Sequence, residues 1–173
     1  MQDLHLHTTY DDGGNSVREM AEKGLRSGFS SIGLCVHSPI PGESWRATED
    51  GVRSFISNVH DAAEMLRGRL PVYCGIEFDS VSTCDLSVFD YVIGSVHVLQ
   101  APGGPWYYDA SREETLRMIE TVYGGDRNQA AEDYYQRWEI SSFLRILRYS
   151  AGIIAAFLPG FYVALTVFQP DMI

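Results

Sequence analysis

The chain has 173 residues and a formal net charge of -10, with 13 Lys and Arg against 23 Asp and Glu. This length accommodates one domain with a sizeable core, or a small domain with an appendage. The acidic balance argues against a nucleic-acid partner, which requires a basic surface. The three cysteines form no Cys-x-x-Cys pair, so a disulfide framework is not expected and a reducing compartment fits better.

The charge is unevenly distributed along the chain. Acidic and basic residues balance in 139–173, so the whole net charge lies in 1–138. The N-terminus lacks the basic and apolar regions of a signal peptide, which favours a cytoplasmic location for this part. We divide the chain into an acidic domain (1–130), an amphipathic connecting helix (131–148) and a hydrophobic helix (149–170).

The acidic part alternates strand and helix patterns. Ser16 with Glu19 has the form of a capping box, and so does Ser111 with Glu114. Apolar residues spaced by three and four positions indicate a further amphipathic helix between these two. The predicted strands are 2–7, 29–35, 70–76 and 89–96, and the predicted helices are 16–27, 49–67 and 111–123.

The predicted strands are largely apolar runs and do not alternate between apolar and polar residues. Such runs, separated by helices, are typical of a parallel sheet covered on both faces, or of a barrel. The predicted fold class is therefore α/β. In these folds the functional residues gather at the carboxyl ends of the strands.

Two histidines separated by one residue, His5 and His7, lie at the end of the first predicted strand. Side chains two apart on a strand share a face, so both imidazoles point to the same place. The turn-prone residues that follow bring the carboxylate of Asp12 back toward them. Imidazole and carboxylate are ligands for zinc, iron and manganese. The alternative interpretation is a pair of surface histidines on an edge strand.

Three further polar residues, His37, Glu77 and His97, each follow one of the other predicted strands. If the strands are parallel neighbours, these side chains converge with the first three on one rim. The alternative is that each residue merely marks the point where a buried strand reaches water. A polar residue of metal-binding type at four successive strand ends favours a metal site.

These segments resemble the polymerase-and-histidinol-phosphatase (PHP) domain family, and within it the histidinol-phosphatase type. The resemblance extends over residues 2–130 and rests on four segments: Asp3-Leu4-His5-Leu6-His7-Thr8-Thr9-Tyr10-Asp11-Asp12-Gly13, Ile32-Gly33-Leu34-Cys35-Val36-His37-Ser38, Tyr73-Cys74-Gly75-Ile76-Glu77 and Asp90-Tyr91-Val92-Ile93-Gly94-Ser95-Val96-His97. It implies part of a distorted barrel of seven strands and helices.

The resemblance also implies a function: hydrolysis of a small phosphorylated substrate, histidinol phosphate in the type it matches, in the pathway of histidine biosynthesis. Up to three divalent ions, zinc, iron or manganese, would polarise the phosphoryl oxygens and lower the pKa of bound water. Glu77 would bridge two ions. The implied metal ligands are His5, His7, Asp12, His37, Glu77 and His97.

The sequence departs from the family pattern at two places. Val36 stands where the family usually has an acidic residue, so a carboxylate that would orient His37 is missing. The family also has another histidine and an Asp-x-His pair later in its sequence, whereas this chain has no histidine after His97. We therefore expect an incomplete site and assign no catalytic residue.

The C-terminal part has a different character, because the 22 residues from Tyr149 to Pro170 carry no charge. About 20 apolar residues span a bilayer, and Arg145 and Arg148 would hold the preceding domain on the cytoplasmic side. We therefore predict insertion of 149–170 into a membrane as a single helix, kinked at Pro159. The alternative is a buried core helix broken at that proline.

Residues 132–138 and 144–149 resemble the spore-germination receptor A-subunit family where it enters the membrane. We expect a partial PHP phosphatase joined near residues 126–138 to a hydrophobic helix, as a truncated fusion, a frame error or a chimeric assembly would produce. The alternative is a membrane-associated, germination-receptor-like fragment with a vestigial PHP head. A third alternative is a PHP domain with another phosphoester substrate, as in those attached to DNA polymerases.

Overall fold

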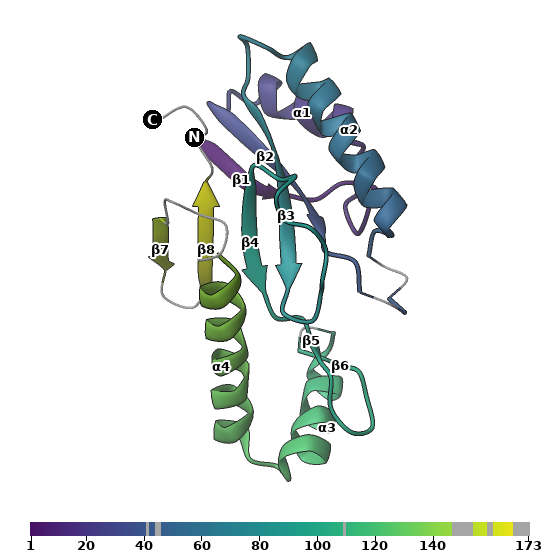
Figure 1. Ribbon diagram of the computed structural model, residues 1–173, viewed down its shortest axis with the longest axis vertical. Helices are drawn as coiled ribbons and strands as arrows, with labels where there is room; N and C mark the ends of the chain where they lie inside the picture. Colours follow the sequence, from purple (N-terminus) through teal and green to yellow (C-terminus); the bar gives the residue numbers. More distant parts are fainter. Residues whose placement is uncertain (41, 44–45, 109, 147–153, 159–160, 168–173) are drawn as a thin grey trace.

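The computed structural model describes residues 1–40, 42–43, 46–108, 110–146, 154–158 and 161–167 (Figure 1). The main strands are β1 (Gln2–Leu6), β2 (Ser31–His37), β3 (Val72–Asp79), β4 (Tyr91–Ser95), β7 (Ile154–Leu158) and β8 (Phe161–Val167). The helices are α1 (Val17–Arg26), α2 (Glu49–Met65), α3 (Arg112–Tyr123) and α4 (Arg127–Ile146). A small hairpin consists of β5 (Val98–Leu99) and β6 (Trp106–Tyr107).

The six main strands form one sheet in the order β1-β2-β3-β4-β8-β7. Strands β1 to β4 are parallel, whereas β8 pairs antiparallel with β4, and β7 antiparallel with β8. The four parallel strands and the helices between them confirm the predicted α/β architecture. Because the parallel strands point the same way, their carboxyl ends meet at one rim of the sheet (Figure 1).

Helices α1 and α2 cover one face of the sheet (Figure 1). The capping box predicted at the start of α1 is present, since Ser16 accepts from the Glu19 amide and the Glu19 carboxylate accepts from the Ser16 amide. Thr48 caps α2 by accepting from the Gly51 amide. Burial of one apolar stripe on each helix against the sheet then holds these elements in place.

The opposite face of the sheet is organised around Tyr91 on β4. Its ring lies over Gly75 on the adjacent β3 and reaches Gly33 on β2, where an added Cβ would be 2.1 Å and 2.2 Å, respectively, from Tyr91 atoms. Its hydroxyl donates to the Leu4 carbonyl at 2.7 Å. One buried side chain therefore connects all four parallel strands, and glycine is required where the ring passes.

The segment after His97 forms a separate layer beyond the carboxyl ends of β3 and β4 (Figure 1). Trp106 packs against Leu99 and Met118, and the guanidinium of Arg117 lies 5.6 Å from the centre of its ring. The loop that carries Trp106 and Tyr107 is thus largely a packing element. Its Tyr107 hydroxyl donates to Glu43 at 2.5 Å, which ties the β5–β6 hairpin to the loop after β2.

The C-terminal region differs from the expected hydrophobic helix. Within 149–170 the described residues are 154–158 and 161–167, and both segments are strands. Periodicity alone does not separate a short apolar strand from a buried helix. Here β-branched and aromatic residues favour a strand, and the open edge of β4 offers backbone partners for β8.

Among the described residues, no helix has the length and apolar character needed to cross a bilayer. The prediction of a transmembrane helix is therefore not supported, and residues 149–153, 159–160 and 168–170 of the predicted span lie outside the described residues. Helix α4 occupies most of the segment that we expected to connect the two parts.

Candidate metal centre

All six candidate ligands predicted from the sequence lie together at the carboxyl-end rim of the parallel strands. Glu77, near the end of β3, is at the centre of this group and is only 6% exposed. The Nε2 atoms of His5 and His7 lie 3.0 Å and 3.1 Å from Glu77 Oε2. The spacing of two residues therefore does direct both imidazoles to one place.

The other two histidines approach Glu77 from the neighbouring strands. His37 and Glu77 are register partners on β2 and β3, and His37 Nδ1 lies 3.4 Å from Glu77 Oε2. His97, just after β4, places Nε2 3.2 Å from Glu77 Oε1. The His37 ring centre is 4.5 Å from that of His7 and 5.0 Å from that of His97. One carboxylate thus contacts four imidazoles.

The turn after β1 contributes two adjacent carboxylates with different surroundings. Asp12, the predicted ligand, has a side chain 56% exposed and lies 3.5 Å from His7 Nδ1 and 3.6 Å from His37 Nε2. The Asp11 side chain is buried, and its Oδ2 lies 2.9 Å from His7 Nδ1 and accepts from the His37 amide at 2.7 Å. Asp11 therefore contacts the main chain of His37 and the ring of His7, so it does not replace the carboxylate that would orient the His37 ring.

The donor set fits divalent metal. Three overlapping groups have ligand atoms within 4.8 Å of one another: His7, Asp11, Asp12 and His37; His5, His7 and Glu77; and His37, Glu77 and His97. In the first group, Asp11 Oδ1 is buried without a hydrogen-bond partner among the described residues. A buried carboxylate oxygen of this kind is costly unless a cation or a donor is present.

The electrostatics of the rim are dominated by mutual stabilisation of opposite charges. Burial alone would raise the pKa of Glu77, but hydrogen bonds from His5, His7 and His97 hold this pKa far below its usual range. Burial opposes the charged form of His7, yet contacts with Asp11 and Glu77 raise its pKa to about 10. The pKa of His97 is raised to about 9, because contacts with Asp79 and Glu77 outweigh its burial.

His37 behaves differently, because burial lowers its pKa and outweighs the attraction of Glu77. Metal binding requires neutral imidazoles, so any ion at this rim competes with protons on His7 and His97. Protonated His7 and His97 thus supply positive charge beside Glu77.

Two buried residues of the rim were missed by sequence analysis. Asp79 is the last residue of β3, and its Oδ2 lies 3.2 Å from His97 Nδ1. Arg46, in the loop before α2, lies 3.3 Å from the same oxygen. The presence of Asp79 two residues after Glu77, on the same face of the strand, was the available signal. Nothing in the local sequence singled out Arg46.

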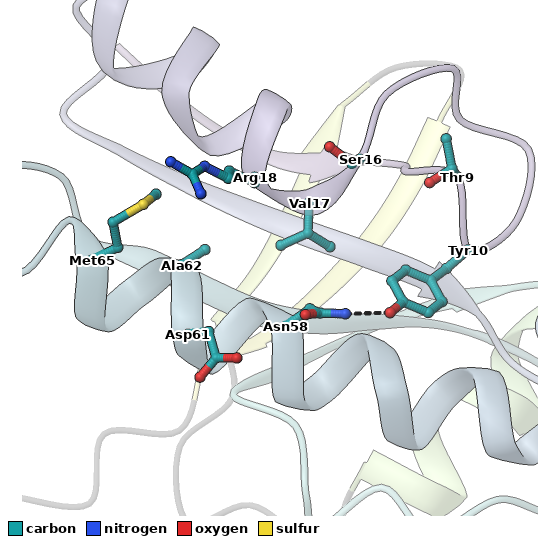
Figure 2. A pocket seen from close by; sticks show the side chains of 9 residues that line it. All are labelled: Thr9, Tyr10, Ser16, Val17, Arg18, Asn58, Asp61, Ala62 and Met65. Carbon is teal, nitrogen blue, oxygen red and sulfur yellow. Dashed lines mark hydrogen bonds between the residues drawn. The ribbon is translucent and has the colours of Figure 1, made fainter.

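A hollow between the start of α1 and α2 has no part in the rim (Figure 2). Its lining includes Tyr10, whose hydroxyl accepts from Asn58, and the oppositely charged side chains of Arg18 and Asp61. It contains a single carboxylate and no histidine. This hollow therefore offers no ligand set for a metal ion.

Comparisons with known proteins separate the chain into two parts. The first part is similar to the Deinococcus radiodurans protein named "Probable histidinol-phosphatase", with 31% identity over 145 residues, covering 77% of this chain and 52% of that protein. The chain thus spans about half the length of this relative. A crystal structure assigned as a histidinol phosphatase from Listeria monocytogenes shares the fold, with a TM-score of 0.57 and 16% identity, covering 88% of this chain and 63% of that one.

The second part matches another family. Residues 124–173 match the family model for the Bacillus/Clostridium GerA spore germination protein. Spore germination protein GerLA of Bacillus cereus is 49% identical over 45 residues, covering 26% of this chain and 9% of that protein. Both resemblances seen in the sequence are therefore confirmed: a PHP-type domain similar to histidinol phosphatases, followed by a segment similar to germination receptors.

Proposed function

We propose that residues 1–130 form a metal-dependent phosphoester hydrolase domain of the histidinol-phosphatase type. Its substrate would be a small phosphorylated molecule, with L-histidinol phosphate converted to L-histidinol and phosphate. The observation that carries the proposal is the convergence of four histidines on the buried carboxylate of Glu77. Similarity to histidinol phosphatases over most of the chain supports the choice of reaction.

The proposed metal ligands are His5, His7, Asp12, His37, Glu77 and His97, as the family resemblance implies. Glu77 belongs to two of the three groups able to hold an ion, which supports its assignment as a bridge. Asp11 is an additional candidate ligand because of its buried, unpartnered oxygen. Zinc, iron and manganese all accept this mixture of imidazole and carboxylate, and up to three ions would bind.

The ions would supply charge that attracts the phosphate, and would activate a water molecule. The residues of the chain would hold that charge in place. The whole chain has a net charge of -10, so bound cations would favour the approach of a phosphate anion. Glu77 and the neutral imidazoles would act as ligands, and the buried strand ends would fix their spacing.

We further propose that the activity of this chain is lower than that of its relatives, since the sequence has no histidine after His97. The test uses the full chain, stripped with a chelator and reloaded separately with Zn²⁺, Mn²⁺ or Fe²⁺. Phosphate release from L-histidinol phosphate is then measured beside Glu77→Gln and His7→Gln, purified in the same way. His60→Gln is the matched control, because His60 is an exposed histidine on α2.

The expected result is slow release that depends on metal, is retained in His60→Gln and is lost in the other two variants. Equal rates in the unaltered chain and in Glu77→Gln would show that the release comes from a contaminant. The proposed hydrolase function would then be wrong.

A second candidate function is membrane association through the germination-receptor-like segment, with a vestigial PHP head. The match of residues 124–173 to the GerA family supports it. Flotation of the full chain with phosphatidylcholine and phosphatidylglycerol vesicles tests it. Recovery of the chain with the vesicles in high salt supports membrane association. A chain that stays at the bottom of the gradient contradicts it.

A further inference from the structure

We infer that Asp79 and Arg46 position the imidazole of His97 for metal binding, with Asp79 contacting the ring and Arg46 holding Asp79. This inference rests on the proposed function, because it takes His97 as a metal ligand. Neither residue was among the ligands that the sequence predicted, and neither belongs to the groups of side chains able to hold an ion.

The two nitrogens of His97 have different surroundings. Nε2 faces Glu77 Oε1 at 3.2 Å, on the side where an ion would bind. Nδ1 faces Asp79 Oδ2 at 3.2 Å and the Ser95 hydroxyl at 3.0 Å, both of which can accept a hydrogen bond. The neutral ring therefore carries its proton on Nδ1, which leaves the Nε2 lone pair free for a metal.

Asp79 also fixes the backbone that carries this ring. The same Oδ2 accepts from the His97 amide at 2.8 Å, so the main chain and the ring of His97 both contact one carboxylate oxygen. The other oxygen, Oδ1, accepts from the Val81 amide at 3.1 Å. Because protein donors occupy both oxygens, Asp79 acts as a positioning residue and not as a ligand.

Arg46 in turn restrains Asp79. Its Nη2 lies 3.3 Å from Asp79 Oδ2, and its Nη1 donates to the Ser38 carbonyl at 3.3 Å. The Ser38 hydroxyl accepts from the Asp79 amide at 2.9 Å. The loop after β2, the end of β3 and the segment that follows β4 are thereby joined into one hydrogen-bonded chain.

The burial of this pair distinguishes it from an ordinary surface ion pair. The side chains of Arg46 and Asp79 are both 0% exposed. Transfer of two charges out of water costs about as much as their attraction returns, so such a pair contributes little net stability. Its defined geometry is better explained by orientation of His97, whose position at the rim depends on the shared oxygen.

The test measures Co²⁺ binding to the full chain through the visible absorption of the bound ion. We expect Asp79→Asn to weaken the affinity by about 10- to 100-fold and to change the spectrum, since loss of a carboxylate partner alters the basicity and orientation of a ligating histidine. Arg46→Met should weaken binding, and Arg46→Lys should restore part of it. Asp90→Asn is the matched control, because Asp90 accepts from the Cys74 amide at the far end of the strands.

A second measurement does not depend on the folding of any variant. In the Zn²⁺-loaded unaltered chain, nitrogen NMR should show His97 with its proton on Nδ1 and its Nε2 bound to the ion. A proton on Nε2, or an Asp79→Asn variant with unchanged affinity and spectrum, overturns the inference while the proposed metal site stands. If the unaltered chain binds no ion, the proposed function and the inference fail together.

Discussion

The two ends of the parallel strands are built from different kinds of contact. At the carboxyl ends, buried ionisable side chains converge on Glu77. At the amino ends, the contacts are apolar or involve the backbone: Leu70 is 1% exposed in the core, and the Cys74 amide donates to Asp90 at 2.7 Å. The same strands therefore carry a candidate binding site at one end and structural packing at the other.

This difference indicates that the amino ends of the strands serve mainly stability and the carboxyl ends mainly metal binding. Buried charges are stabilising only when their partners are well placed, so a cluster of this kind is a poor means of holding strands together. Apolar burial at the amino ends and along α1 and α2 provides most of the stability. Substitutions at the two ends should accordingly have separable effects on folding and on metal binding.

The largest effect on stability is expected at the amino ends. Leu70→Ala should lower the free energy of unfolding by about 2–5 kcal/mol, because it leaves a cavity beside Gly24 and Ile32. The affinity of the folded chain for Zn²⁺ should not change. Urea unfolding with a chelator present measures the first quantity, and Val88→Ala, at a residue 48% exposed, is the control. An altered metal affinity would contradict the proposal that the amino ends affect stability and not metal binding.

The opposite pattern is expected at the carboxyl ends. Glu77→Gln should weaken Zn²⁺ binding by at least about 100-fold, since it removes the charged ligand shared by two metal groups, whereas loss of an outer partner alone costs 10- to 100-fold. The loss of stability in the chelated form should be smaller than in Leu70→Ala. Isothermal titration calorimetry and urea unfolding measure the two effects. Unfolding as severe as in Leu70→Ala would make Glu77 a structural residue.

A smaller effect is expected between the two ends, at Tyr91. Tyr91→Phe removes the hydrogen bond to the Leu4 carbonyl and should cost about 1 kcal/mol of stability. Metal affinity should change little, because the ring remains to pack over Gly33 and Gly75. Urea unfolding checks this, with Tyr73→Phe as the control on an exposed tyrosine. A large loss of metal affinity would mean that this hydroxyl sets the strand positions at the rim.

The smallest effect is a release of protons. At pH 7.5, His7 and His97 are protonated in the metal-free chain, since their pKa values are about 10 and about 9. Binding of Zn²⁺ should therefore release about two protons, and apparent affinity should rise with pH until both pKa values are passed. Calorimetry in buffers of different ionisation enthalpy measures this release. Equal heats in all buffers at pH 7.5 would contradict the assigned protonation.

Most of the parallel part of the fold could be predicted from the sequence. Uninterrupted apolar runs predicted the four parallel strands, and the Ser16 and Ser111 caps predicted two helix starts. The spacing of His5 and His7 predicted their common direction toward one place. These predictions were possible because the strand period and the capping chemistry are local properties of the chain.

The remaining features depend on contacts between distant parts of the chain. Arg46 gains its role only when the loop after β2 folds over Asp79, 33 residues away in sequence. The strands at 154–158 and 161–167 depend on the open edge of β4, and an apolar run does not reveal this partner. Asp11 and Asp12 are adjacent and chemically identical, so only the folded turn shows which of them is buried.

The most direct test of the metal-centre proposal is the metal content of the full chain after equilibrium dialysis against Zn²⁺ or Mn²⁺. We predict at least one tightly held ion per chain in the unaltered protein and in His60→Gln, and a clear loss in Glu77→Gln and His7→Gln. The same low content in all four proteins would contradict the assignment of this rim as a metal centre.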